Sequence, residues 1–360
     1  TLTNNYLDMK KALLLITLML GCMNVFAQKV DKAEINKLKT FLAQTSEKGG
    51  TNAAALNIVN LNAPATWEGV TVANGHVTAI EWKDKHLAGS LDLSGFSALT
   101  KVDVSRNHLT SLNCQGDAAL TDLNASRNKL TTANLEGCTG LVDLKIYRNR
   151  LTEFDVTNIP LIQTVNISNN YLVDLNVSNC ITLKTLNCQG NHLENLLVEN
   201  CTNLKNLYCG YNKLQNITLA GLVNLQNLNI DDNEINKLLI ANLPSLSSFL
   251  CSDNNMQQLA VSNCPRLLDL VCSYNDLTEL SVNQCPNLLF VDCSYNDLST
   301  LTLSNQTFLQ RVLCNNNQLI TLDVSFDQAL TYVNCRNNMI TDIRTIGDPN
   351  LGMIACQWNY

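Results

Sequence analysis

The sequence predicts a repeat solenoid built from about thirteen units of 21 residues. The first observation is an asparagine that recurs every 21 residues, with no insertion or deletion between its occurrences. The second is a pair of apolar columns that keep the same period ahead of the asparagine. A fixed period in this range is typical of solenoids, in which each unit packs only against its neighbours. The asparagine column comprises Asn107, Asn128, Asn149, Asn170, Asn191, Asn212, Asn233, Asn254, Asn275, Asn296, Asn317, Asn338 and Asn359.

Each unit follows the pattern L-x-x-L-x-[C/V/I]-x-x-N-x-L, counted from Leu99 in the first unit and illustrated by residues 267–277. Apolar residues alternate with period two around the second and third apolar positions, which predicts a short strand with one buried face. Stacked units therefore place these strands in a parallel sheet. The second half of a unit, as in residues 172–177, repeats the alternation and predicts a strand-like opposite wall.

The asparagine follows each strand, where the chain turns and its backbone groups lose their sheet partners. An amide side chain both donates and accepts hydrogen bonds, so stacked asparagines can satisfy these buried backbone groups. We therefore assign this column a structural role.

Motif and period together resemble the leucine-rich repeat family, specifically its 21-residue bacterial subclass, with exported members of the internalin-like and Bacteroidetes surface types. The resemblance covers residues 99–360. It implies a curved solenoid with a parallel β-sheet on the concave side, and a surface that binds proteins or glycans.

Ahead of the repeats we expect three segments. Residues 1–8 are an upstream segment without a structural role. Residues 9–27 resemble a signal peptide, with a positive start, an apolar stretch and a cleavage site after Ala27. A lipoprotein acylated at Cys22 is the alternative. Either interpretation predicts export to the periplasm, the cell surface or the medium.

We expect residues 28–98 to form an N-terminal cap, which contains a helix within residues 31–45 and an irregular first strand. Trp67 and Trp82 are expected to pack against the first units. The solenoid proper covers residues 99–360 and stops partway through a unit. We expect either a truncated C-terminus or self-association through an open edge.

Fourteen of the fifteen cysteines occupy apolar columns of the repeats rather than paired positions, and the other, Cys22, lies in the predicted signal peptide. They alternate with valine, isoleucine and leucine from unit to unit, which indicates buried thiols. Zinc binding is the alternative, but no C-x-x-C pair is present. Disulfides between neighbouring units have unfavourable geometry. The largest column holds Cys188, Cys209, Cys251, Cys272, Cys293, Cys314, Cys335 and Cys356, and a second holds Cys138, Cys180, Cys201, Cys264 and Cys285.

The positions two, four, six and seven places after the first leucine of a unit are expected to face outward. Early units place Arg106, Arg127 and Arg148 in one such column. Two interpretations stay open: a ladder of salt bridges with Asp103, Asp122 and Asp143, or an anion site. Middle units carry an acidic group, Asp231, Asp232, Glu234 and Asp253, which we interpret as a solvated face.

Later units place apolar and aromatic residues at outward positions, which is typical of a contact surface. Cross-strand packing that only stabilises the sheet is the alternative. The candidate ligand-binding residues are Tyr208, Tyr211, Leu250, Val271, Tyr274, Phe290, Tyr295, Arg311, Leu313 and Tyr332.

The sequence thus predicts an exported, non-enzymatic binding protein that recognises a protein or glycan, as in adhesion or host contact. A structural solenoid at the cell envelope is the alternative. No cofactor is expected, because no nucleophile elbow, metal motif or phosphate loop is present. A formal net charge of −7 and a pI of about 5.1 argue against nucleic acid as a partner.

Overall fold

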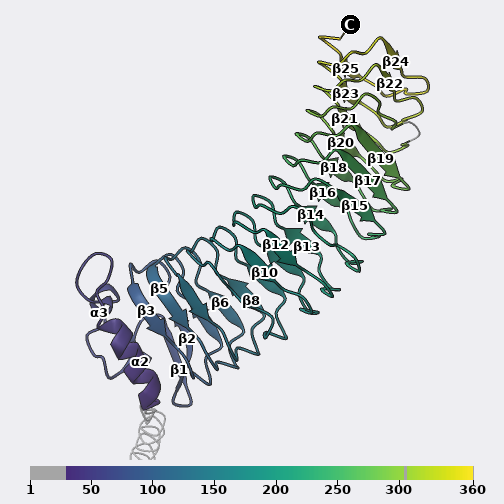
Figure 1. Cartoon of the computed structure of the whole chain (residues 1–360). Helices are drawn as coiled ribbons and strands as arrows, with labels where there is room; N and C mark the ends of the chain where they lie inside the picture. The colour runs from purple at the N-terminus through teal and green to yellow at the C-terminus, as the bar shows by residue number, and fades with distance from the viewer. Residues whose placement is uncertain (1–29, 304–305, 360) are drawn as a thin grey trace, which may run out of the picture.

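The structure is a computed structural model that describes residues 30–303 and 306–359. The predicted signal peptide, residues 9–27, lies outside the described residues. The chain forms an elongated, bent solenoid of stacked turns (Figure 1), as the repeat period predicts. A 15-stranded main sheet runs along the body. Its strands, in spatial order, are β1 (Val70–Ala73), β2 (His76–Glu81), β4 (Lys101–Asp103), β6 (Asp122–Asn124), β8 (Asp143–Lys145), β9 (Thr164–Asn166), β11 (Thr185–Asn187), β13 (Asn206–Tyr208), β14 (Asn227–Asn229), β16 (Ser248–Leu250), β18 (Asp269–Val271), β20 (Phe290–Asp292), β21 (Arg311–Leu313), β23 (Tyr332–Asn334) and β25 (Met353–Ala355).

Shorter sheets form the opposite wall, so the prediction that both walls are strand-like is confirmed. Strands β16, β20 and β23 lie toward the inside of the bend, and β15, β17 and β19 toward the outside (Figure 1). The opposite wall comprises β3 (Ala88–Asp92), β5 (His108–Asn113) and β7 (Thr132–Asn134), then β10 (Asp174–Asn176) and β12 (Asn195–Leu197), then β15 (Leu238–Ala241), β17 (Gln258–Ser262) and β19 (Glu279–Asn283), and finally β22 (Thr321–Asp323) and β24 (Asp342–Arg344).

Equivalent residues of successive turns lie side by side. Only β1 and β2 pair antiparallel in the main sheet. From β4 onward each pair is parallel with a shift of 21 residues, as in Leu270 opposite Val291. Each turn buries its apolar columns against the next, and these residues form one continuous core.

The first described segment is helical. Helix α2 (Lys32–Leu42) begins at Asp31, whose carboxylate accepts hydrogen bonds from the Ala33 and Glu34 amides. It is followed by α3 (Asn52–Ala55) and the 3₁₀ turn η1 (Pro64–Thr66). The predicted helix is thus present, and Phe41 on its buried face stacks on Trp82 with ring centroids 5.9 Å apart.

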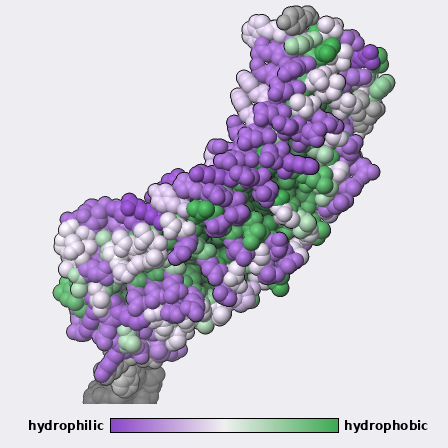
Figure 2. Space-filling model, in the orientation of Figure 1, coloured by the Kyte–Doolittle hydropathy of each residue, from purple (hydrophilic) through white to green (hydrophobic). Residues whose placement is uncertain are grey.

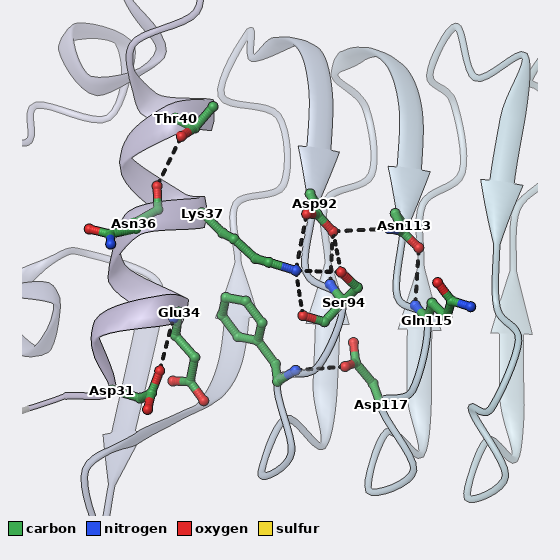
Figure 3. A network of polar contacts seen from close by, with 11 residues as sticks. Asp31, Glu34, Asn36, Lys37, Thr40, Asp92, Ser94, Asn113, Gln115 and Asp117 are labelled. Atoms are coloured by element: carbon green, nitrogen blue, oxygen red, sulfur yellow. Dashed lines mark hydrogen bonds and ion pairs between the residues drawn. The ribbon is translucent and has the colours of Figure 1, made fainter.

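Polar contacts also tie α2 to the end of β3 (Figure 3). The Lys37 ammonium donates to the Ser94 carbonyl at 2.7 Å and forms an ion pair with Asp92 at 3.1 Å. Trp67 and Trp82 are buried, as predicted. The helix therefore covers the first turns of the solenoid.

All thirteen repeat asparagines make the same set of hydrogen bonds, and we call them the asparagine ladder. In Asn128, Oδ1 accepts from the Leu109 amide of the preceding turn at 3.0 Å. Its Nδ2 donates to Val104 of the preceding turn at 3.0 Å and to Ala125 of its own turn at 3.1 Å. The pattern recurs along the whole column, so the predicted structural role is confirmed.

One outward position was predicted wrongly. Serines six places after the first leucine, such as Ser105 and Ser294, are buried. The strand has already ended two residues earlier, so strict alternation no longer applies. The serine hydroxyl turns back to the last strand residue instead, as in the 2.6 Å bonds from Ser105 to Asp103 and from Ser294 to Asp292.

The cysteine columns are buried, as predicted, with one exception. All fourteen described cysteines are free, and thirteen are buried. The exception is Cys356, in the last described turn, which is exposed. In the second column, the Sγ atoms of Cys138 and Cys201 approach a carbonyl of the preceding turn, at 3.0 Å in both cases. These thiols therefore add contacts between successive turns to those of the asparagine ladder, and they also fill space in the core.

Candidate functional site: the edge and face of the main sheet

The residue just before each ladder asparagine lies beyond the C-terminal end of its main-sheet strand, in a left-handed backbone conformation. These residues line up along one long side of the main sheet. Their φ lies between 51° and 64° in all thirteen units. We call this column the left-handed edge. Glycine, asparagine and aspartate tolerate this conformation, whereas other residues pay roughly 1–2 kcal/mol. The column holds Arg106, Arg127, Arg148, Asn169, Gly190, Tyr211, Asp232, Asp253, Tyr274, Tyr295, Asn316, Asn337 and Trp358.

Two tyrosines of this edge form a stack. Tyr274 and Tyr295 lie on neighbouring turns, with ring centroids 4.3 Å apart and planes 9° from parallel. They remain 51% and 44% exposed. The stack therefore presents aromatic surface to solvent while it occupies two strained backbone positions.

A second aromatic group lies on the sheet face, along the first residues of three adjacent strands. The Arg311 guanidinium lies 5.5 Å from the Phe290 ring centroid and 5.6 Å from that of Tyr332. Register places these three residues side by side. Within the described residues Arg311 has no salt-bridge partner, so the two rings are its principal neighbours.

The last strand residues lie on the same face, beside these two groups. Leu250 and Val271 are direct register neighbours, and Leu313 follows beyond Asp292. All three leucine and valine side chains are half-buried. We call the combined surface the aromatic strip: Leu250, Val271, Tyr274, Phe290, Tyr295, Arg311, Leu313 and Tyr332.

The remaining two candidate residues are not part of this strip. Tyr208 lies two turns before Leu250 in the same column, and Tyr211 lies three turns before Tyr274; these separations are roughly 9–10 Å and 14 Å at the usual strand spacing. Asp232 and Asp253 separate the tyrosines along the left-handed edge. The structure therefore brings together eight of the ten candidates.

An apolar border of the strip was missed from the sequence. A shallow groove of about 380 Å³ is lined by Leu268, Leu289, Phe308 and the neighbouring Arg266, Ser247 and Asn287. Leu289 directly precedes Phe290 of the strip, and Phe308 is exposed. The signal was present in the sequence, because Leu268 and Leu289 share a position that earlier units fill with Lys184 and Lys205.

The opposite wall carries a second apolar surface that sequence reasoning also missed. A hydrophobic band follows β10, β12 and β15 along the visible face (Figure 2). Leu197 and Leu239 are among its exposed residues. Proline side chains at 21-residue spacing, Pro244, Pro265 and Pro286, line a neighbouring groove.

The early arginines do not form the expected salt-bridge ladder. Within the described residues, no salt bridge involves Arg106, Arg127 or Arg148. The Asp103 carboxylate accepts from Ser105, and Asp143 pairs with Lys145 at 2.5 Å.

Among the acidic residues of the middle units, Asp231 is held by hydrogen bonds within the protein. Asp231 accepts hydrogen bonds from the Ser252 amide at 2.8 Å and from the Asn229 amide group at 2.9 Å. Burial raises the pKa of this carboxyl above its ordinary value. No cluster of three or more metal-ligating side chains occurs in residues 30–303 and 306–359. In the same residues, no helix has the length and apolar character needed to span a bilayer.

No protein-family model matches the sequence, and no curated protein matches it either. Solved structures do match. YopM from Yersinia enterocolitica WA-314 shares 24% identity with a TM-score of 0.62, over 72% of this chain and 55% of that one. The functional domain of InlJ from Listeria monocytogenes, which includes a cysteine ladder, shares 25% identity with a TM-score of 0.50, over 78% and 70%.

A third similar structure is the leucine-rich repeat protein LIC12759 from Leptospira interrogans. It shares 21% identity with a TM-score of 0.55, over 71% of this chain and 86% of that one. These similarities agree with the parallel solenoid described above. The chain therefore has the leucine-rich repeat fold.

Proposed function

We propose that the chain is an exported, non-enzymatic binding protein that recognises a protein partner through the aromatic strip, as an adhesion or host-contact factor does. In this proposal residues 9–27 direct export and residues 28–98 cap the solenoid. The observation that carries the proposal is that two partly exposed rings, Phe290 and Tyr332, flank Arg311 on the same sheet as the exposed Tyr274–Tyr295 stack, while Arg311 has no salt-bridge partner among the described residues.

The chemistry of the strip supports a protein partner. Tyrosine and arginine are enriched among residues that dominate binding energy at protein interfaces. The groove beside Leu289 extends the strip with apolar surface, which a partner side chain can fill.

Backbone strain supplies a second argument. Tyr274 and Tyr295 occupy left-handed positions where other units place asparagine or glycine, with φ values of 53° and 54°. Fold stability alone favours the unstrained residues. Strain that persists in a structure is a reason to look for a function of the side chain.

A non-enzymatic role agrees with the state of most buried cysteines; Cys264 is the exception, because its hydrogen bond with Cys285 lowers its pKa to about 7. Burial raises the pKa of Cys188 to about 12, and burial likewise raises that of Cys201 to about 11. Such thiols remain protonated at neutral pH and are poor nucleophiles.

The test is a binding screen of the purified protein against arrays of extracellular-matrix proteins and neutral glycans. A double variant, Phe290→Ala with Tyr295→Asn, should lose at least tenfold in affinity for each protein bound by the wild type. Its thermal midpoint should change little, because both rings are partly exposed and asparagine suits the left-handed edge.

Tyr171→Ala is the matched control, because Tyr171 is 49% exposed and stacks on His192 outside the strip. It should bind as the wild type does. If the double variant still binds, the aromatic strip is not the binding site. If its thermal midpoint falls steeply, the two rings serve to pack the sheet rather than to bind a partner. If the wild type binds glycans but no protein on the arrays, the proposed protein partner is wrong and the ligand is a glycan. Concentration-dependent assembly in sedimentation, without array binding, would favour the scaffold alternative.

A further inference from the structure

The left-handed edge carries a concentrated basic surface at its N-terminal end. Arg106, Arg127 and Arg148 occupy consecutive turns and are exposed. The strands that precede them, β4, β6 and β8, are direct neighbours in register. Lys129 and Arg150, two places further along the second and third turns, are also exposed. These five exposed cations lie on three turns, residues 99–161, which also hold Lys101, Lys145 and seven carboxylates.

Nearby carboxylates do not neutralise this surface. Within the described residues no salt bridge involves any of the five cations. Glu47, which interacts electrostatically with Lys129, is held by His86 at 2.9 Å and by His108 at 2.7 Å. The three arginines on neighbouring turns therefore repel one another, and no salt bridge within the described residues offsets that repulsion.

The arginines also occupy strained backbone positions. Their φ values are 57°, 56° and 53°, whereas the next two turns place Asn169 and Gly190 at the same position. Strain and repulsion act together at these three sites. Both disfavour arginine unless an external anion compensates.

We propose that this basic edge binds a linear acidic glycan that carries carboxylates or sulfates. Arginine forks pair with such oxyanions through two parallel hydrogen bonds. The Tyr147 ring, with the Arg127 guanidinium 5.9 Å from its centroid, offers a partly exposed aromatic face for sugar C–H groups.

A glycan suits this edge better than an acidic peptide. Neighbouring turns place the arginines about 4.7–4.9 Å apart at their backbones. Side chains on one face of an extended peptide recur at about 6.6 Å, which does not match. The partly exposed Tyr147 ring, which suits a sugar face, is the feature that favours a glycan over a peptide.

The site is independent of the aromatic strip. Six turns separate Arg148 from Tyr274, which is roughly 28 Å along the sheet. Either site can therefore fail its test without affecting the other.

The test is titration of the full chain with four polymers, polygalacturonate, dextran sulfate, neutral dextran and poly-L-glutamate. We expect salt-sensitive binding of at least one acidic glycan, no binding of dextran, and at least tenfold weaker binding of poly-L-glutamate. The triple variant Arg106→Asn, Arg127→Asn, Arg148→Asn should lose at least tenfold in affinity. Its thermal midpoint should not fall, because asparagine tolerates the left-handed edge.

A matched control removes the same charge elsewhere. The variant Lys184→Asn, Lys205→Asn, Lys237→Asn changes three exposed lysines outside the basic edge, and its affinity should stay within twofold of the wild type. Absence of acidic-glycan binding by the wild type would overturn the proposal. An equal loss in the control, or poly-L-glutamate binding as tight as that of the glycans, would overturn it too.

Discussion

A single substitution in the asparagine ladder tests whether the amide hydrogen bonds, rather than side-chain volume, hold successive turns together. Asn254→Leu replaces the amide with an apolar side chain of similar size. In the wild type Oδ1 of Asn254 accepts from the Ile235 amide at 3.0 Å. Its Nδ2 donates to the carbonyls of Ile230 at 3.0 Å, Cys251 at 3.3 Å and Ser252 at 3.1 Å.

The structure distinguishes which of these groups lose their only partner. The Ile230 carbonyl keeps Asn233, and the Cys251 carbonyl keeps Asn275. The Ser252 carbonyl keeps the Asp232 amide. Only the Ile235 N–H is left buried without an acceptor, which costs about 1–3 kcal/mol, and each lost additional bond removes about 0.5–1.5 kcal/mol. The side-chain amide has two hydrogens, so two such bonds are lost, and we expect a total loss of about 2–6 kcal/mol in unfolding free energy.

Urea unfolding followed by circular dichroism measures the total, and native-state hydrogen exchange measures the Ile235 amide directly. Exchange at Ile235 should accelerate more than at the equivalent Leu214 amide, whose acceptor Asn233 is retained. The control is Asn255→Leu, since Asn255 is exposed and its side chain forms no hydrogen bond within the described residues. A loss below about 0.5 kcal/mol, or no larger than the control's, would refute the ladder as a source of stability.

Two further predictions concern titratable groups, one buried and one exposed. Burial raises the pKa of Asp117 from 3.8 to about 7, while its Oδ1 accepts from the Phe96 amide at 2.7 Å (Figure 3). The folded state therefore binds this proton more tightly than the unfolded state. The resulting stability is present below about pH 4 and is lost as pH rises through 7, by at most about 4 kcal/mol. The variant Asp117→Asn keeps the acceptor oxygen but has no carboxyl proton, so its stability should depend less on pH. At pH 8 it should unfold at a higher urea concentration than the wild type. Identical profiles of stability against pH for the two proteins would contradict the pKa shift. For the thiols, Cys356 is the exposed one among the fourteen described, so Cys356→Ser should remove the fast phase of reaction with a thiol reagent under native conditions, whereas Cys293→Ser should leave it unchanged.

The repeat architecture follows from the sequence because each turn has a fixed length. Once Asn275 and Asn296 are known to be equivalent, Tyr274 and Tyr295 must be neighbours, and Phe290 must lie beside Arg311. The burial of the cysteine columns follows from the same register. These inferences need only the period and the two-residue alternation of a strand.

Side-chain direction beyond the strand end could not be predicted in the same way. Ser105 lies six places after the first leucine, where simple alternation points outward, but the backbone approaches its left-handed turn at Arg106 and buries the serine. The sequence also failed to predict that the early arginines lack salt-bridge partners, for a related reason. Asp103 and Asp143 are close in sequence to those arginines, but each carboxylate contacts a residue two places further along the chain instead, Ser105 and Lys145 respectively.

The left-handed edge connects both binding proposals to the physics of the turn. Every turn requires φ > 0 at this position so that the next residue, the ladder asparagine, can face inward. Six units meet the requirement with asparagine, aspartate or glycine, but seven use arginine, tyrosine or tryptophan at a cost of roughly 1–2 kcal/mol each. Five of these seven occur in runs: three arginines are consecutive, and two tyrosines on neighbouring turns stack. Selection for stability alone would spread asparagine along the column. Runs of one chemistry at strained, exposed positions are instead expected where successive turns contact successive parts of the same ligand.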